Sequence, residues 1–577
     1  MSNPKIEDKD FYNKINDKYR RYKIAKKKKS IKEICFPKKF QLQIPQLFLA
    51  EYIGPDSPYK GLMIFHKIGS GKTCTAIRIG EEWKSIRKIC VVVPASLIGN
   101  FRNELRSKCA DNSYLTNKER EQLKNLHPLD DEFKEIIARS NERIDQYYKI
   151  FSYNKFIEDA KDKNISLRNA ILIIDEVQNM VSEEGVYYNI LYETIYESPR
   201  DLRVILLSAT PMFDKPVEIA LTLNLLRIPY ELPTGKEFYN MFVTARVTKS
   251  SINFEAKNLD IFKERIKGYI SYFRGAPAHV FPEMVIRYVR SDMSDFQLSS
   301  YSTVLKSEEK KFRKMFRKKL NKFKKGHIVD LPNNFYIGTR IISNIAFPNR
   351  KIGEQGYESL RGKNLLLENV QNYSIKFYKI IKKIKSSSGP VFVYSNFKEY
   401  GGIKSFVRIL EAQGYKSYID HGEGRKRFAI WSGDEKQEIR EEIKNVFNRP
   451  ENFNGSQIKV LIGSPSSREG ISVKNVRQVH VMEPYWNWSR IMQIIGRAVR
   501  YCSHKDLPEE QRNVRVYIYI ATHPTIKETI DQYVMKLALK KHRLIEQFEQ
   551  ALKETAIDCE LFKNANVDEN EDIKCET

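Results

Sequence analysis

Residues 61–74 read GLMIFHKIGSGKTC, and this stretch decides the fold. The apolar run at its start predicts a short buried strand, and TAIRIGEEW at 75–83 continues with the spacing of a helix. A strand that breaks into glycine, lysine and threonine before a helix is the layout of a loop that holds the phosphate chain of a nucleotide. The stretch therefore predicts a nucleotide-binding α/β domain.

Each residue type in this loop has a chemical reason to be there. Gly69 and Gly71 allow a tight turn that points backbone amides at phosphate oxygens, Lys72 brings charge to the β- and γ-phosphates, and Thr73 can ligate Mg²⁺. His66 stands where the common pattern has glycine or alanine, so the first turn is atypical. The predicted nucleotide-binding set is His66, Lys67, Ile68, Gly69, Ser70, Gly71, Lys72 and Thr73.

The segment AILIIDEVQN at 170–179 predicts the second half of the site. A buried apolar strand delivers Asp175 and Glu176 to its carboxyl end. Asp175 suits Mg²⁺ coordination, and Glu176 suits the general base that polarises the attacking water.

The composition indicates a globular protein with a polyanionic partner. At 577 residues the chain is too long for one core, and its net charge of +27 favours attraction to nucleic acid, although a solvated lysine-rich surface is an alternative. No apolar run is long enough to span a bilayer, so no membrane partner is expected. Seven cysteines are scattered without a CxxC pair, which indicates neither a disulfide framework nor a zinc site and fits a reducing compartment.

Two stretches alternate apolar strands with helical segments, which favours parallel sheets covered by helices. The first has GLMIF, ICVVV, YYKIF, AILII and RVILL, and the second has PVFVY, RFAIW, IKVLI, VHVME and VRVYIYI. The predicted fold class is α/β with two such lobes. The predicted domains are a mobile basic arm at 1–38, lobe 1 at 39–235, a linker and helical basic insertion at 236–385, lobe 2 at 386–523, and a C-terminal helix with a frayed acidic tail at 524–577.

The insertion contains LKSEEKKFRKMFRKKLNKFKKGH at 305–327. Its aromatic and leucine residues recur at helical spacing and predict a packed stripe, while the remaining positions are basic. Arg317, Lys318 and Lys319 on the basic face are candidate contacts to a nucleic-acid backbone, and a merely solvated face is the alternative.

Four motifs together resemble a known family. GSGKT, DEVQ, LLSATPM at 206–212 and QIIGRAVR at 493–500 resemble motifs I, II, III and VI of superfamily 2 helicases and translocases. The resemblance implies two RecA-like lobes with ATP in the cleft between them. It makes Arg500 the first candidate for an arginine finger and Arg497 the second, with Gln493 sensing the nucleotide. Arg497 and Arg500, three positions apart, are expected on one helical face. The alternative is that these arginines bridge to acids.

Looser matches extend the resemblance. FQLQIPQLFLAEY at 40–52 resembles the adenine-sensing segment, with Gln46 the first candidate reader and Gln41 the second. Gln178, which replaces the histidine of the DExH form, is a further nucleotide-binding candidate. Segments that resemble motifs Ia, III, IV and V supply the other candidates, and Trp486 or Trp488 could stack on a base, although core anchoring is the alternative. The coupling candidates are Ser208, Ala209, Thr210 and Gly470, and the nucleic-acid candidates are Pro94, Ser96, Ser395, Arg468 and Ser472.

Phrases between the motifs give a narrower resemblance. SATPMFDKPVEIALTLNLLR, GYISYFRGAPAHVFPEM and GTRIISNIAFPN resemble the helicase-like ATPases of nucleocytoplasmic large DNA viruses, whose poxvirus prototypes are nucleoside triphosphate phosphohydrolase I and the small subunit of the early transcription factor. The resemblance implies an ATP- and Mg²⁺-dependent enzyme that acts on DNA in viral transcription, in the virion and the host cytoplasm, with a large transcription factor subunit or viral RNA polymerase as possible partners. An RNA helicase is one alternative. A promoter-binding or polymerase-docking factor with a regulatory ATPase is another.

Overall fold

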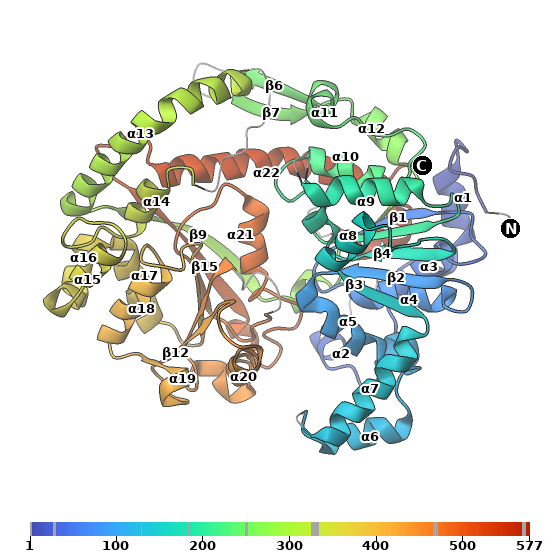
Figure 1. The fold of residues 1–577 in the computed structure, drawn as a ribbon, viewed down its shortest axis with the longest axis horizontal. Helices are drawn as coiled ribbons and strands as arrows, with labels where there is room; N and C mark the ends of the chain where they lie inside the picture. Colours follow the sequence, from blue (N-terminus) through green and yellow to red (C-terminus); the bar gives the residue numbers. More distant parts are fainter. Residues whose placement is uncertain are drawn as a thin grey trace. The chain divides into compact units, whose positions relative to one another are not determined.

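The computed structural model describes residues 3–26, 30–128, 130–182, 185–247, 252–324, 334–465, 471–567 and 573–577, with only the backbone described for Val247, Ile252, 311–324 and Gln437. The chain forms two compact units, coloured by sequence in Figure 1. Unit 1 comprises Met1–Ala278 and Leu544–Thr577, and unit 2 comprises His279–Arg543. Both units are mixed α/β, as the alternation of strands and helices predicted.

Unit 1 is built on a six-stranded sheet in the order β3-β2-β4-β5-β1-β8, with every pair parallel. The five predicted strands are confirmed, and helices cover both faces of the sheet (Figure 1). The strands are β1 Gly61–His66, β2 Lys88–Val93, β3 Tyr148–Ser152, β4 Ala170–Ile174, β5 Arg203–Ser208 and β8 Ile270–Phe273. The first helices are α1 Phe11–Lys18, α2 Ile31–Cys35, α3 Ile44–Tyr52, α4 Lys72–Trp83, α5 Ile98–Leu105, α6 Asn117–Asn125 and α7 Asp131–Asp145. The others are α8 Tyr153–Lys161, α9 Val186–Glu197, α10 Val217–Asn224, α11 Gly235–Phe242, α12 Leu259–Ile266 and α23 Cys559–Asn566, and a hairpin joins β6 Val243–Val247 to β7 Ile252–Ala256.

The prediction of a mobile arm at the N-terminus is wrong. Phe11, Ile15 and Tyr19 are at most 1% exposed, and they belong to the same core as Phe48 of α3 and Phe562 of α23. Aromatic burial at this spacing fixes α1 against the domain, because each large ring removes much apolar surface from water. Lys14 and Lys18 therefore lie on a packed helix.

The C-terminus also belongs to unit 1. Ile557 donates its backbone amide to the Ile270 carbonyl in β8, at 2.8 Å, and Lys263 forms ion pairs with Glu554 and Glu576 at 2.5 and 2.9 Å. Residues 573–577 are thus held against α12, so the acidic tail is not frayed there. The predicted lobe 1 at 39–235 was too short at both ends, because its sheet and core use segments distant in sequence.

Cysteine pairing also differs from the expectation of reduced thiols. Cys74 in α4 is disulfide-bonded to Cys109, with Cα atoms 5.4 Å apart, and Cys559 is bonded to Cys575, with Cα atoms 5.7 Å apart. Linear spacing gave no sign of these pairs, because folding brings together residues that are 35 and 16 positions apart. Cys90, by contrast, is a buried free thiol.

Substituting Cys109→Ser should lower the stability of unit 1. The bond closes a loop with a sequence separation of 35, for which chain-entropy arguments give about 3–4 kcal/mol. We therefore expect a lower thermal unfolding midpoint for Cys109→Ser than for wild type under non-reducing conditions, and little difference in excess reductant. Peptide mapping without reductant provides the control, and recovery of Cys74 and Cys109 only as free thiols would contradict the pairing.

Unit 2 is built on a seven-stranded parallel sheet in the order β11-β12-β13-β10-β14-β15-β9. Its five predicted strands are confirmed. The strands are β9 Glu283–Asp292, β10 Val391–Tyr394, β11 Lys416–Ser417, β12 Arg427–Trp431, β13 Val460–Gly463, β14 Gln478–Val481 and β15 Asn513–Thr522. The helices are α13 Asp295–Lys324, α14 Ile337–Asn344, α15 Glu354–Ser359, α16 Leu367–Tyr373, α17 Ile375–Lys385, α18 Ile403–Ala412, α19 Tyr418–His421, α20 Gln437–Phe447 and α21 Trp488–Ile495.

The predicted linker and insertion at 236–385 is split between the units. Its first part contributes β8 to the sheet of unit 1, and β9 pairs along its whole length with β15 of unit 2. The basic residues Arg317, Lys318 and Lys319 lie on the long helix α13, and their side chains, like those of the predicted apolar stripe, fall outside the described residues. Helix α22, Ile530–Glu554, runs through the division, with residues to Arg543 in unit 2 and residues from Leu544 in unit 1.

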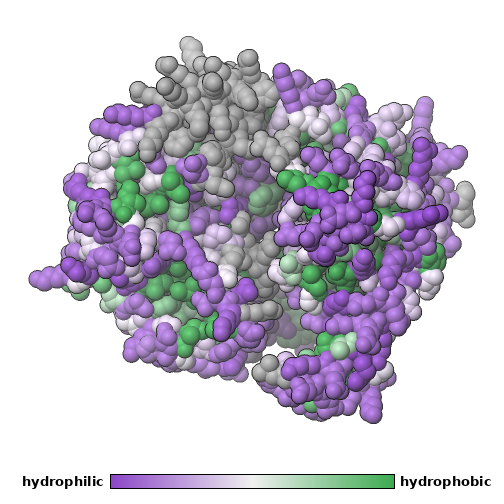
Figure 2. Space-filling model, viewed as in Figure 1, coloured by the Kyte–Doolittle hydropathy of each residue, from purple (hydrophilic) through white to green (hydrophobic). Residues whose placement is uncertain are grey.

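The surface agrees with the charged composition. On the face shown in Figure 2, hydrophilic residues predominate on both units and hydrophobic areas are small and separate. Among the described residues, no helix combines the length and the apolar character needed to cross a bilayer.

Candidate nucleotide-binding and catalytic site

The predicted motifs of unit 1 meet at one edge of its sheet. Strands β4, β5 and β1 are neighbours, and because they are parallel their carboxyl ends lie side by side. Asp175 follows β4, Ser208 ends β5, and the loop 67–71 follows β1. Residues separated by more than a hundred positions are thereby brought to one edge, which is where α/β sheets bind ligands.

The loop after β1 has the backbone of a phosphate cradle. Gly69 and Gly71 adopt φ of 85° and 75°, which side chains with a Cβ rarely allow, and α4 begins at Lys72 immediately after this turn. The Ser70 hydroxyl is buried and has no hydrogen-bond partner in the described protein. No ion pair engages Lys72 within the described residues. These groups are therefore available to a ligand with several anionic oxygens.

Two residues assigned to nucleotide binding turn out to support the loop from within the protein. His66 is fully buried, and its Nε2 lies 2.8 Å from the Ser271 hydroxyl, so its ring is not open to a nucleotide. Burial, with the nearby charge of Lys72, lowers the pKa of His66 to about 3, so the ring is neutral. Lys67 is half-exposed and forms an ion pair with Glu549 at 3.2 Å.

The predicted adenine reader Gln46 is also engaged inside the protein. Only 3% of Gln46 is exposed; its Oε1 accepts from the Gln43 amide at 2.8 Å, and its Nε2 donates to the Gly71 carbonyl at 3.4 Å. A Cβ on Gly71 would lie 2.7 Å from this Nε2. Gln46 therefore braces the phosphate loop in this structure, while the alternative Gln41 is exposed.

Asp175 and Glu176 have the placement expected of a metal-binding and a catalytic carboxylate. Burial raises the pKa of the Asp175 carboxyl, the neighbouring charge of Glu176 raises it further, and Lys72 opposes the increase. Glu176 has φ of 49° and ψ of 47°, a conformation that costs a non-glycine residue about 1–3 kcal/mol and is common at functional sites. The Tyr153 hydroxyl lies 2.6 Å from the Asp175 carbonyl oxygen and 2.9 Å from that of Glu176, which supports the turn.

A chain of hydrogen bonds joins Glu176 to the motif at the end of β5. Gln178 donates from Nε2 to Glu176 Oε2 at 2.6 Å, and its Oε1 accepts from the Ser208 hydroxyl at 2.6 Å. The Thr210 amide in turn donates to the Ser208 oxygen at 3.0 Å. Gln178 thus fixes one carboxylate oxygen of Glu176. Ala209, which lies between Ser208 and Thr210, is buried.

Replacing Ser208 with alanine should weaken this linkage without removing the catalytic carboxylate. The variant leaves the buried Gln178 carbonyl without its donor, and an unsatisfied buried group costs about 1–3 kcal/mol. We expect Ser208→Ala to lower polymer-stimulated ATP turnover roughly fivefold to twentyfold. Steady-state ATPase assays measure this. Ser113→Ala, in a solvent-side turn of the same unit, is the control, and equal stimulation in both variants would argue against the linkage.

The predicted arginines lie after helix α21. The helix ends at Ile495, and Arg497 and Arg500 occupy the following turns, so the expectation that they share a helical face is wrong. Arg500 donates to the Ser472 hydroxyl and Arg497 to the Ile471 carbonyl at 3.4 Å, and Gln493, within α21, is half-exposed.

The predicted nucleic-acid residues have different surroundings. Ser395 is fully buried, and its hydroxyl donates to Glu483, so the prediction of direct contact to nucleic acid does not fit its position. Ser472 is engaged by Arg500, whereas Ser96 is exposed beside the buried Pro94. Arg468 and Gly470 lie outside the described residues.

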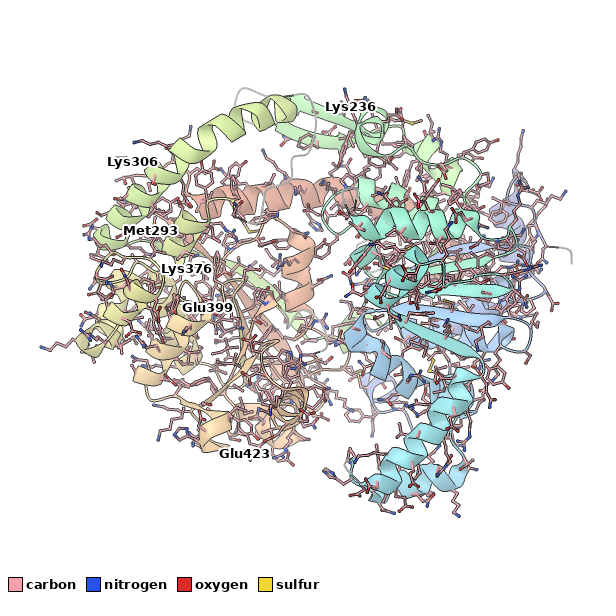
Figure 3. All side chains as sticks on the ribbon, in the orientation of Figure 1. Lys236, Met293, Lys306, Lys376, Glu399 and Glu423 are labelled. Atoms are coloured by element: carbon pink, nitrogen blue, oxygen red, sulfur yellow. A yellow bond between two sulfur atoms is a disulfide. The ribbon has the colours of Figure 1, made fainter. Side chains whose placement is uncertain are left out.

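Glu483 is the centre of a buried polar network that sequence reasoning missed. It accepts from Ser395, the Asn396 amide and Asn344 Nδ2, and burial raises its pKa while these hydrogen bonds lower it. Asn344 also accepts from Lys376, labelled in Figure 3, and that ammonium forms a fully buried ion pair with Asp531 at 2.6 Å. The network ties the segment after β10 to that after β14.

Trp486 belongs to a continuous stack of aromatic and arginine side chains. Its ring lies 4.0 Å from that of Tyr485, centroid to centroid, Arg340 lies over Trp486 at 4.8 Å and over Phe397 at 5.1 Å, and Arg490 lies over Tyr485 at 4.0 Å. Because Trp486 is 6% exposed, the core-anchor interpretation holds for it in this structure.

The residues of unit 1 fit an Mg²⁺–nucleotide. The positive-φ glycines, the unpartnered Ser70 hydroxyl and Lys72 suit phosphates, and Thr73 with Asp175 offers oxygen ligands. Among the described residues, no group of three or more histidine, cysteine, aspartate or glutamate side chains could hold a metal.

The fold and this edge of the sheet define a P-loop ATPase with two parallel α/β units. The SNF2-related domain matches residues 19–345, and the helicase conserved C-terminal domain matches 375–502. The chain belongs to the SNF2-related helicase family. It is therefore an ATP-hydrolysing enzyme of the Snf2-like, superfamily 2 type, and proteins of this class bind nucleic acid.

Viral proteins are similar to most or all of the chain. A protein of Acanthamoeba polyphaga mimivirus, provisionally named as an ATP-dependent RNA helicase, is 53% identical over 100% of this chain and 99% of its own length. A "Termination factor NPH-I homolog" of African swine fever virus (isolate Warthog/Namibia/Wart80/1980) is 26% identical over 88% of this chain and 77% of its own length.

Proposed function

We propose that this enzyme is a DNA-dependent ATPase and translocase that acts in viral transcription. The observation that carries the proposal is the convergence of Lys72, Glu176 and Ser208 at one sheet edge, in a chain with a net charge of +27. The sequence similarity to a termination factor homolog of another virus supports a role in transcription. By the same resemblance, the proposed location is the virion and host cytoplasm, and the proposed partners are a large transcription factor subunit or viral RNA polymerase.

In this proposal each residue of the loop has a defined task. The amides of 69–73 and the Lys72 ammonium bind the β- and γ-phosphates, and Thr73 with Asp175 holds Mg²⁺, which neutralises phosphate charge when bound. Glu176 accepts a proton from the attacking water, and Gln178 keeps its carboxylate in one orientation. The donated hydrogen bond from Ser208 makes this orientation sensitive to motif III.

The arginines of unit 2 are proposed to complete catalysis. Arg500 would supply positive charge to the γ-phosphoryl group, with Arg497 second and Gln493 sensing the nucleotide. Burial lowers the pKa of Arg500, so its charge is partly desolvated and its electrostatic effect is less screened by water. Because the two units would grip the polymer differently in each nucleotide state, an ATP-dependent change between them would convert hydrolysis into a step along the polymer.

The proposed contacts to the polymer comprise residues of the motif segments and basic residues of α13. The exposed Ser96 of unit 1 remains in the set, as do Arg468 and Ser472 from the segment that resembles motif V, and Gly470 remains a coupling candidate. Pro94 and Ser395 are both buried, which argues against direct contact by either. Arg317, Lys318 and Lys319 on α13 add a basic segment. Phosphate contacts of this kind give binding that weakens steeply with salt.

RNA is the second candidate substrate, since the mimivirus relative is named as an RNA helicase. The test is the ATPase rate of the purified full chain with no polymer, single-stranded DNA, duplex DNA or RNA in parallel. Selective stimulation by DNA supports the proposal, and selective stimulation by RNA supports the alternative. A rate indifferent to every polymer would instead favour a docking factor with a regulatory ATPase.

A further inference from the structure

The phosphate loop of unit 1 is held from behind by residues near the C-terminus of the chain. Strand β8 pairs with β1, and the Lys67 amide donates to the Phe273 carbonyl at 3.0 Å. Gly275, with φ of 93°, lies so close to Ser70 that a Cβ there would be 3.4 Å from the Ser70 backbone. The segment directly after β8 therefore forms the rear wall of the loop.

A buried hydrogen-bond chain continues from the loop through β8 to the C-terminal segment. The Ser271 hydroxyl donates to Asp558 Oδ2 at 2.5 Å, so its oxygen is left to accept from His66 Nε2–H at 2.8 Å. All three side chains are fully buried, and Asp558 Oδ1 also accepts from the Tyr272 amide at 2.9 Å. His66 Nδ1 is then a buried acceptor without a partner, which leaves the Ser271 bond as its one polar anchor in the described protein.

A second contact reaches the loop from the same segment. Glu549 of α22 pairs with Lys67 at 3.2 Å, with 17% and 34% of these side chains exposed. Asn566 of α23 accepts from the Arg274 amide at 2.8 Å and donates to the Tyr272 carbonyl at 3.1 Å. The segment from α22 to α23 thus contacts Lys67 directly through Glu549 and His66 indirectly through Asp558 and Ser271.

We propose that Asp558 and Glu549 are positioning residues for ATP binding, acting on the phosphate loop through Ser271–His66 and through Lys67. This inference rests on the proposed assignment of the loop as the phosphate site. Its consequence is that a segment following unit 2 in sequence sets the geometry of the nucleotide site in unit 1. Helix α22, which carries Glu549, begins within unit 2 at Ile530, so the support for the loop is covalently continuous with that unit.

The primary test is Ser271→Ala, with ATP KM and kcat measured separately on the full chain. Loss of a buried hydrogen bond should raise KM roughly threefold to tenfold while changing kcat less than about threefold, since no group that touches the reacting atoms is removed. Glu549→Gln should raise KM about twofold, because a partly exposed pair contributes less. Glu560→Gln, which alters a 3.9 Å pair with Lys563 within α23, is the control and should match wild type.

A double-mutant cycle separates positioning from general destabilisation. If Ser271 and Asp558 act through one chain, the KM effects of Ser271→Ala and Asp558→Asn will be clearly less than additive in the double variant. Unchanged KM in a folded Ser271→Ala variant, or full additivity, would overturn the inference. Should either buried variant fail to fold, an unchanged KM for Glu549→Gln overturns it instead. Lys72→Ala tests separately whether the loop is the phosphate site, because wild-type turnover of that variant would reject this assignment.

Discussion

Glu176→Gln is expected to reduce ATP turnover by about a thousandfold while leaving nucleotide binding and nucleic-acid binding close to wild type. The change removes the carboxylate that accepts the proton from water but keeps the size of the side chain and an acceptor toward Gln178. The measurement is single-turnover hydrolysis of ATP, accompanied by titration of a fluorescent nucleotide. A folded Glu176→Gln variant with more than a tenth of wild-type turnover would contradict the assignment of the general base.

Two comparisons sharpen this result. Glu218→Gln is the matched acidic control in the same unit: Glu218 accepts from the Phe213 and Asp214 amides at 2.6 and 3.0 Å and is not assigned a role at the phosphates. Lys72→Ala should also abolish turnover, but it should weaken nucleotide affinity as well, because it removes charge that binds phosphate in the ground state. Glu176→Gln and Lys72→Ala therefore give different patterns of loss if the two roles are correct.

Arg500→Ala is expected to reduce kcat by roughly a thousandfold or more if this residue is the arginine finger, since such groups contribute about 10³–10⁵ in rate. Nucleotide affinity should change much less, because the charge acts mainly in the transition state. Arg497→Ala should give a smaller loss. Stopped-flow and steady-state phosphate release would measure both variants.

The contacts of Arg500 supply the control for this experiment. Its guanidinium donates to Ser472, so a structural role alone would make Ser472→Ala nearly as damaging as Arg500→Ala. Catalysis by Arg500 predicts instead that Ser472→Ala retains most of its turnover. Similar kcat values for Arg500→Ala and Ser472→Ala would indicate that Arg500 has only a structural role.

Much of the fold was predictable because buried parallel strands have a strong sequence signal. The runs at 61–65, 170–174 and 390–394 are apolar, short and bounded by turn residues, and all became central strands. The shorter strand β8 was not predicted as a strand, because ISYF mixes polar and aromatic residues and gains its strand character only by pairing with β1. Tertiary contact with β1 therefore made β8 a strand.

The residues of the candidate site also fall into those identifiable from the sequence and those whose surroundings depend on tertiary contacts. Gly69, Gly71, Lys72, Asp175 and Glu176 were identifiable because phosphate and metal chemistry demands particular residues at particular spacings. The surroundings of His66, Gln46 and Ser395 were not identifiable, since their partners lie up to about two hundred positions away, as Ser271 does from His66. Nothing local in the sequence encodes which polar group will meet which after folding.

The sequence by itself therefore determined the class of enzyme, the two α/β units and the candidate residues of the phosphate and carboxylate site, because local pattern and chemistry specify them. Only the tertiary structure decided that the N-terminal segment is packed, that Cys74 meets Cys109, and that Asp558 meets Ser271. These features depend on contacts between segments far apart in the chain. Such contacts are fixed by the packing of the whole domain, and that packing leaves no periodic signal in the linear sequence.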